Sequence, residues 1–146
     1  LYVGSENTNY NAYGLSERGK IKQRKRYEDL IEGIKVYVDQ YPLDQKLSIN
    51  EVCQTFGINS CKLKKMFKEQ FQCSVYDYFI TLRMQHAHML VSTGTLAFKE
   101  IAYRVGYNEY SSFVKYFRKH HQQLPKQVRL HAQKHYFISK DEQEAD

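Results

Sequence analysis

The stretch from Glu100 to His121, EIAYRVGYNEYSSFVKYFRKHH, decides the fold. Apolar residues recur at helical spacing in each of its two halves, and Gly106 stands between the halves. A glycine readily takes the left-handed conformation that ends a helix, and Asn108 is suited to cap the helix that follows. Two short helices joined by such a turn are typical of a helix-turn-helix.

The second half of this stretch predicts one buried and one exposed helix face. Phe113, Tyr116 and Phe117 recur at helical spacing, so we expect them to point inward. The helical period then directs another row of side chains to solvent. We call it the second outward row, and it consists of Ser111, Val114, Lys115 and Arg118. This row is a candidate surface for reading a nucleic acid.

The same pattern occurs once earlier in the chain. Ser48 and Glu51 fit the S-x-x-E capping box of a helix start, and Gly57 ends that helix as Gly106 ends its counterpart. The two copies align with a period of roughly fifty residues, with one residue inserted in the second copy before Phe117. In the first copy Leu63, Met66 and Phe67 face inward, and the first outward row consists of Cys61, Lys64, Lys65 and Lys68. Two cationic rows in register are much harder to attribute to chance than one.

The segment between the two copies, from Ser74 to Val91, predicts a single uninterrupted helix. It starts with a capping serine, contains neither glycine nor proline, and would be ~25 Å long. Successive major-groove faces of DNA lie ~34 Å apart, so this helix, with helix widths added, can hold two recognition helices in adjacent groove segments. Its apolar positions, expected to complete the core, are Val75, Tyr78, Phe79, Leu82, Met89 and Leu90.

The ends of the chain set the remaining boundaries. Residues 1–20 are rich in Asn, Ser, Gly and Tyr and lack a helical period, so we expect an N-terminal arm or linker there. An amphipathic helix is predicted from Ile21 to Tyr41. We assign the first helix-turn-helix subdomain with the linker helix to residues 21–92, the second subdomain to residues 93–138, and a fraying acidic tail to residues 139–146. The predicted fold is all-α, with two helix-turn-helix subdomains joined by a long linker helix.

The overall charge suits a polyanionic partner. Lys and Arg total 22 against 16 Asp and Glu, which gives a net charge of +6. Charge alone does not choose between a nucleic acid, an acidic protein and a membrane surface. No apolar run approaches the ~20 residues of a membrane helix. No signal-peptide pattern opens the chain, so we expect a soluble, cytoplasmic protein that does not bind a membrane.

The pattern of chemically reactive residues argues against an enzyme. Three cysteines without a C-x-x-C pair fit neither a disulfide framework nor a structural zinc site. His131 and His135 are spaced to share one helix face, which can bind a metal, but no third ligand is near in the sequence. There is no Gly-rich phosphate loop and no cluster of carboxylates. We therefore expect no catalytic residues, no cofactor and no metal.

Three strings carry a resemblance to a known family: LSINEVCQTFGINSCKLKKMFKEQF, YDYFITLRMQHAHMLV and EIAYRVGYNEYSSFVKYFRKHHQQLPKQVR. From about Tyr27 to Arg129 the chain resembles the DNA-binding domain of the AraC/XylS family of bacterial transcription regulators. The resemblance implies two helix-turn-helix subdomains on one long helix, with the second helix of each in the major groove. It also implies that the residues facing the DNA bases are Cys61, Lys64, Lys65, Ser111 and Lys115.

Three positions depart from the pattern of that family. Ala97 stands where a Ser or Thr cap is usual, which would weaken the helix start by ~1 kcal/mol unless Thr95 or Thr93 substitutes. Tyr110 stands where a proline is frequent, and Gln122 stands where a glycine is common. These changes affect the local turns and not the fold.

The outward rows and the resemblance together predict a site for double-stranded DNA. The expected base-facing residues are Cys61, Lys64, Lys65, Tyr110, Ser111, Ser112 and Lys115. The expected phosphate-binding residues are Lys68, Arg118 and Lys119. Lysine lacks the guanidinium fork that binds guanine through two hydrogen bonds, so phosphate contact is a rival role for Lys64 and Lys65.

The sequence thus predicts a sequence-specific transcription regulator with two recognition helices in adjacent major-groove segments. RNA polymerase is a further expected partner, and the missing initiator Met is consistent with an effector domain upstream of this chain. The alternative is a helical protein-interaction module that applies the same faces to an acidic partner and has only non-specific affinity for nucleic acid. A reproducible site among duplexes selected from a random pool separates the two hypotheses.

Overall fold

The computed structural model describes the backbone of residue 14 and of residues 16–144, and side chains as far as residue 140. Within that part the chain forms seven helices and no strand, so the all-α prediction is confirmed. The helices are α1 (Glu17–Asp39), α2 (Ile49–Phe56), α3 (Ser60–Phe71), α4 (Val75–Thr93), α5 (Phe98–Arg104), α6 (Tyr110–His121) and α7 (Pro125–Glu144). None of these helices is both long and apolar enough to cross a bilayer. Most of the predicted arm and the last two residues of the predicted tail lie outside the described residues.

α1 begins earlier than the sequence pattern predicts, and α7 extends into the residues predicted to form a fraying tail. α1 begins at Glu17 rather than Ile21, because the Ser16 hydroxyl caps it by accepting a hydrogen bond of 3.2 Å from the Gly19 amide. An ion pair of 2.6 Å between Lys20 and Glu17 supports the same turn. α7 continues through the described part of the predicted tail, which contains no glycine or proline to end it.

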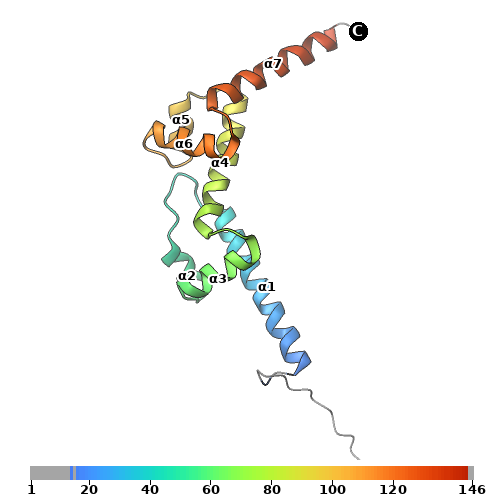
Figure 1. Cartoon of the computed structure of the whole chain (residues 1–146), viewed down its shortest axis with the longest axis vertical. Coiled ribbons are helices and arrows are strands. Elements are labelled where there is room, and N and C mark those ends of the chain that lie inside the picture. Colours follow the sequence, from blue (N-terminus) through green and yellow to red (C-terminus); the bar gives the residue numbers. More distant parts are fainter. Residues whose placement is uncertain (1–13, 15, 145–146) are drawn as a thin grey trace, which may run out of the picture.

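Two hydrophobic cores lie along α4. The first core is built by α1, α2, α3 and the first turns of α4, and the second core by α5, α6, α7 and the rest of α4. Figure 1 shows the α5–α6 unit above the α2–α3 unit along the direction of α4. Large, fully buried side chains include Phe67 and Phe79 in the first core and Phe113 and Phe117 in the second.

The buried face of α4 differs in part from the prediction. Met89, predicted to lie in the core, is 52% exposed. Met84 and Ala87, which were not predicted, are fully buried in the second core. Buried positions of α4 recur three or four residues apart, and Met89 falls on the opposite side of the helix. The reason is that α4 packs against a different set of helices along each part of its length.

The glycine turns form in both copies, as predicted. Gly57 and Gly106 follow the ends of α2 and α5 with φ of 62° and 84°, in the left-handed region that favours glycine. Ser48 caps α2 by accepting a hydrogen bond of 3.3 Å from the Glu51 amide, which is one half of the predicted capping box. The Glu51 carboxylate does not close the box in return. It accepts hydrogen bonds from the hydroxyls of Tyr37, in the last turn of α1, and Tyr41, just after that helix.

The prediction that Asn108 caps the second recognition helix is wrong. α6 begins at Tyr110, and its N-cap residue, Glu109, makes no side-chain cap bond. In the first copy Asn59 does cap α3, because its side-chain oxygen accepts a hydrogen bond of 2.8 Å from the Lys62 amide. The residue inserted in the second copy lies in this turn. It therefore moves Asn108 one position away from the helix start.

The departures from the family pattern are accommodated locally. Ala97 is the N-cap of α5 and makes no side-chain cap bond. Thr93 does not substitute, since its hydroxyl donates to the Leu90 carbonyl at 2.8 Å. Gln72 and Gln122 end α3 and α6 with φ of 58° and 57°. Each glutamine side chain donates a hydrogen bond of 2.9 Å to a carbonyl of the preceding helix, which offsets part of the cost of left-handed backbone.

Candidate nucleic-acid interface

α6 presents the second outward row to solvent, with one exception. Phe113 and Phe117 are fully buried, and their ring centroids lie 5.5 Å apart. Val114, predicted to point outward, is half-buried and packs against the second core. The exposed residues on the outer side of the helix are Ser111, Ser112, Lys115, Arg118 and Lys119.

α3 presents the first outward row in full. Leu63, Met66 and Phe67 are buried, as predicted. The exposed residues on the other side are Cys61, Lys64, Lys65 and Lys68. Lys62 is also exposed but lies outside the predicted site, although the predicted site includes Ser112, its match in the second copy. The alignment of the two copies was the signal that could have found it.

The cations of the two outward rows have few acidic partners. Lys65 Nζ lies 3.9 Å from Glu69 Oε1, and such a long, exposed pair contributes little to stability. Among the residues that the structure describes, no ion pair involves Lys64, Lys115 or Arg118. Basic residues also fill the last turn of α6, where the helix dipole favours positive charge. Both helix faces therefore carry positive charge that is mostly unpaired within the part of the chain that the structure describes.

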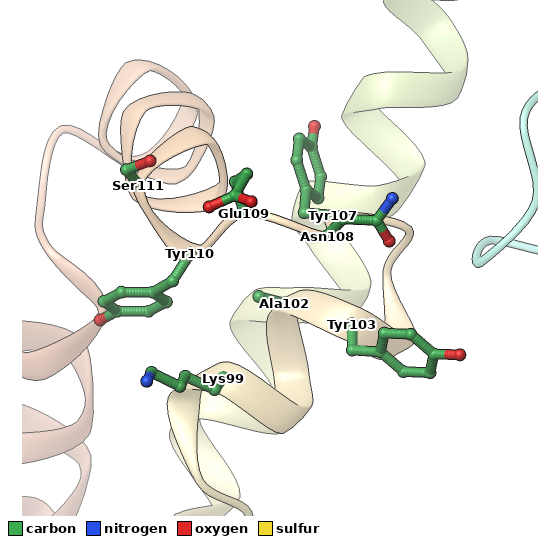
Figure 2. A pocket seen from close by; sticks show the side chains of 8 residues that line it. All are labelled: Lys99, Ala102, Tyr103, Tyr107, Asn108, Glu109, Tyr110 and Ser111. Carbon is green, nitrogen blue, oxygen red and sulfur yellow. The ribbon is translucent and has the colours of Figure 1, made fainter.

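A cavity of about 470 Å³ opens at the turn between α5 and α6. Figure 2 shows Lys99 of α5 together with Tyr110 and Ser111 of α6 among the residues around it. Tyr110 is half-buried, and its ring centroid lies 6.0 Å from that of Phe113. The Tyr110 ring thus packs on the protein at the start of α6, whereas Lys99 and Ser111 are exposed to solvent.

Two histidines fix the end of α6 on α4. The ring of His88 stacks on Phe117, with 6.3 Å between centroids and 7° between planes, and lies 4.8 Å from the ring of His121. The Nε2 atom of His121 lies 2.9 Å from the Met84 carbonyl oxygen. Burial, and then the neighbouring His121, lower the pKa of His88, so its neutral form is favoured. In the described part of the chain, no three histidine, cysteine or acidic side chains are placed to hold one metal ion.

The two basic helices stand at different positions along α4. This helix has 19 residues, which corresponds to a length of ~28 Å. In Figure 1 α5 and α6 lie to the left of the upper part of α4, while α2 and α3 lie at its lower end, with α2 to the left. Two helix-turn-helix units with basic outer faces, carried on one connecting helix, define a helix-turn-helix protein of the DNA-binding class.

Comparison with known proteins agrees with this class. A family model described as a helix-turn-helix domain matches residues 52–131. The chain belongs to this family and is of the AraC/XylS type. The resemblance seen in the sequence is therefore confirmed.

Individual relatives show how much of a protein the match covers. The lactose operon transcription activator of Staphylococcus xylosus is 33% identical over 86 residues, which are 58% of this chain and 30% of that protein. The solved C-terminal domain of the two-component response regulator yesN from Fusobacterium nucleatum is 30% identical, with a TM-score of 0.63, over 69% of this chain and 98% of that one. A probable AraC family transcriptional regulator from Rhodopseudomonas palustris shares the fold at 21% identity, with a TM-score of 0.65, over 71% and 97% of the two chains. The chain thus spans about a third of the length of the curated relatives that it matches.

Proposed function

We propose that this chain is the DNA-binding part of a transcription regulator and that it recognises a specific double-stranded site with α3 and α6. The observation that carries the proposal is the exposed row of cations and short polar side chains at matching positions of both helices. Each helix would enter the major groove, where every base pair presents its own pattern of donors and acceptors. The length of α4 together with the helix widths suits the ~34 Å between successive groove faces.

Base contacts are assigned to the middle and the first turn of each helix. Lys65 and Lys115 hold matching central positions, where an ammonium group can donate to the acceptors of guanine. Tyr110 would act through its hydroxyl, since its ring packs on Phe113. The full base-facing set is Cys61, Lys64, Lys65, Tyr110, Ser111, Ser112 and Lys115.

Phosphate contacts are assigned to exposed cations of the two helices, which are Lys62, Lys68, Arg118 and Lys119. The first amides of α6 would contribute as well, because Glu109 makes no side-chain cap bond to them and helix N-termini favour phosphate. Such contacts fix the position of the protein on the duplex and carry no sequence information.

The complete regulator would contain more than this chain. Because the chain spans about a third of its curated relatives, we propose an effector domain upstream of it in the full protein. RNA polymerase is the expected protein partner, since the Staphylococcus xylosus relative is a transcription activator. Both proposals can be checked on the intact gene product, by its length and by co-purification with the polymerase.

Selection of duplexes from a random pool tests the proposed DNA recognition. We expect a reproducible site about twenty base pairs long, with two sequence elements one helical turn apart. Affinity for that site should fall steeply as salt is raised, because phosphate contacts release counterions. Binding that depends on salt but is blind to sequence would overturn the proposal and favour a helical protein-interaction module.

A further inference from the structure

A buried charge lies between the two helix-turn-helix units, and none of the DNA contacts assigned above uses it. Arg83 of α4 is only 7% exposed. Among the described residues, no carboxylate forms an ion pair with it. Burying a guanidinium without a carboxylate partner is costly, so other contacts must hold it in place.

The Arg83 guanidinium joins segments that are far apart in the sequence. Its Nη2 atom donates a hydrogen bond of 2.7 Å to the Gln45 carbonyl oxygen, in the connection between α1 and α2. Its Cζ atom lies 4.8 Å from the ring centroid of Phe79, in the first core, and 5.6 Å from that of Tyr107, in the second. A carbonyl dipole and two aromatic faces thus take the place of a carboxylate.

The turn between α5 and α6 contacts the same guanidinium through Gly106. A Cβ atom added at Gly106 would overlap Arg83 Nη2 and would lie 2.6 Å from the Leu43 carbonyl oxygen. The Gly106 backbone therefore contacts Arg83 and the α1–α2 connection at once, and a residue with a side chain does not fit. Figure 1 shows this connection rising from the first unit toward the second.

We propose that these contacts fix the distance and angle between the two units and so set the spacing of the two DNA elements that the protein accepts. We call the five contacting residues, Leu43, Gln45, Arg83, Gly106 and Tyr107, the Arg83 clasp. The inference rests on the function proposed above. Each unit packs on its own part of α4, and Arg83 lies where the first core ends and the second begins. The clasp therefore resists bending or twisting of α4 at that position. Arg83 is a positioning residue that acts through the protein and not on DNA.

Arg129 offers a matched control, because it uses the same chemistry within one unit. It donates hydrogen bonds of 3.2 Å and 2.6 Å to the carbonyl oxygens of Val91 and Leu96. Its Cζ atom lies 4.0 Å from the ring centroid of Phe98. Val91 belongs to the second core, and Leu96 and Phe98 pack against it, so Arg129→Met removes similar bonds and leaves the join between the two units intact.

The test measures binding to duplexes in which the spacing between the two selected elements is changed by one base pair. Such a change turns one element by roughly 35° and shifts it by ~3.4 Å. Wild type and Arg129→Met should lose about tenfold or more in affinity, whereas Arg83→Met should lose less than about threefold. At the selected spacing, Arg83→Met should keep the salt dependence of the wild type, because Arg83 does not contact phosphate.

An unchanged spacing preference in Arg83→Met would overturn the inference. Equal relaxation in Arg129→Met would also overturn it, since lost stability would then explain the effect. If circular dichroism shows that Arg83→Met is unfolded, Arg83→Lys takes its place. The ammonium group can reach only one of the partners, so a relaxed spacing preference supports the clasp and a wild-type preference refutes it. Failure of the proposed function gives a different result, because the wild type would then select no site with two elements, and both proposals would fall.

Discussion

Replacing Lys115 by alanine tests whether α6 reads bases. Lys115 is exposed on the outer side of the helix, and no described acidic residue pairs with it. The free energy of unfolding should therefore change by less than about 0.5 kcal/mol. Loss of a contact to a base should weaken binding to the selected site by ~1–3 kcal/mol, which is roughly 5- to 150-fold in Kd.

Fluorescence-anisotropy titrations against selected and scrambled duplexes, at several salt concentrations, separate a base contact from a phosphate contact. A base contact lowers affinity for the selected duplex far more than for the scrambled one. A phosphate contact lowers both alike and reduces the slope of log K against log salt by about 0.9. Lys65→Ala should behave like Lys115→Ala on the other DNA element, and Lys134→Ala, exposed on α7, is the control. If both variants shift the titration of the selected site by less than about twofold, the base-contact assignment is wrong.

Three further predictions concern the fold. Gly57→Ala should lower the free energy of unfolding by ~1 kcal/mol, because φ is 62° but an added Cβ meets no atom within 4 Å. Gly106→Ala should lower the free energy of unfolding clearly more than Gly57→Ala does, as measured by urea titration of both variants. Equal losses of stability would refute the close contact at that turn. Asn59→Ala should cost ~1 kcal/mol through loss of the cap on α3, whereas Asn108→Ala should cost less than ~0.5 kcal/mol. A loss at Asn108 as large as that at Asn59 would mean that it caps α6. Because the folded-state pKa of His88 lies below 6.5, the unfolded chain binds the proton more readily, and stability is lost as pH falls below that value. Thermal melts at decreasing pH should show this fall, and an identical fall in His88→Gln would contradict the assignment.

The sequence by itself determined the two helix-turn-helix units and most of both outward rows. The signals are local: a glycine at a left-handed turn and inward aromatic residues at helical spacing lie within one short window. Helical geometry alone then exposes Lys65 and Lys115 on the opposite face. Val114, predicted to be exposed, and Tyr110, predicted to face bases, are both half-buried against the second core. Spacing within one helix does not report which neighbouring helices and rings will cover a side chain.

Tertiary structure alone decided how the units are joined. A charged residue in the middle of a helix is normally exposed, so the sequence pattern gave no reason to place Arg83 inside. Its burial depends on Gln45 and Gly106, which belong to other segments of the chain and reach it only in the folded state. Helical periodicity records which side of a helix is apolar. It does not record which distant backbone carbonyls and aromatic rings will contact one guanidinium. Those contacts to Arg83 hold one unit against the other.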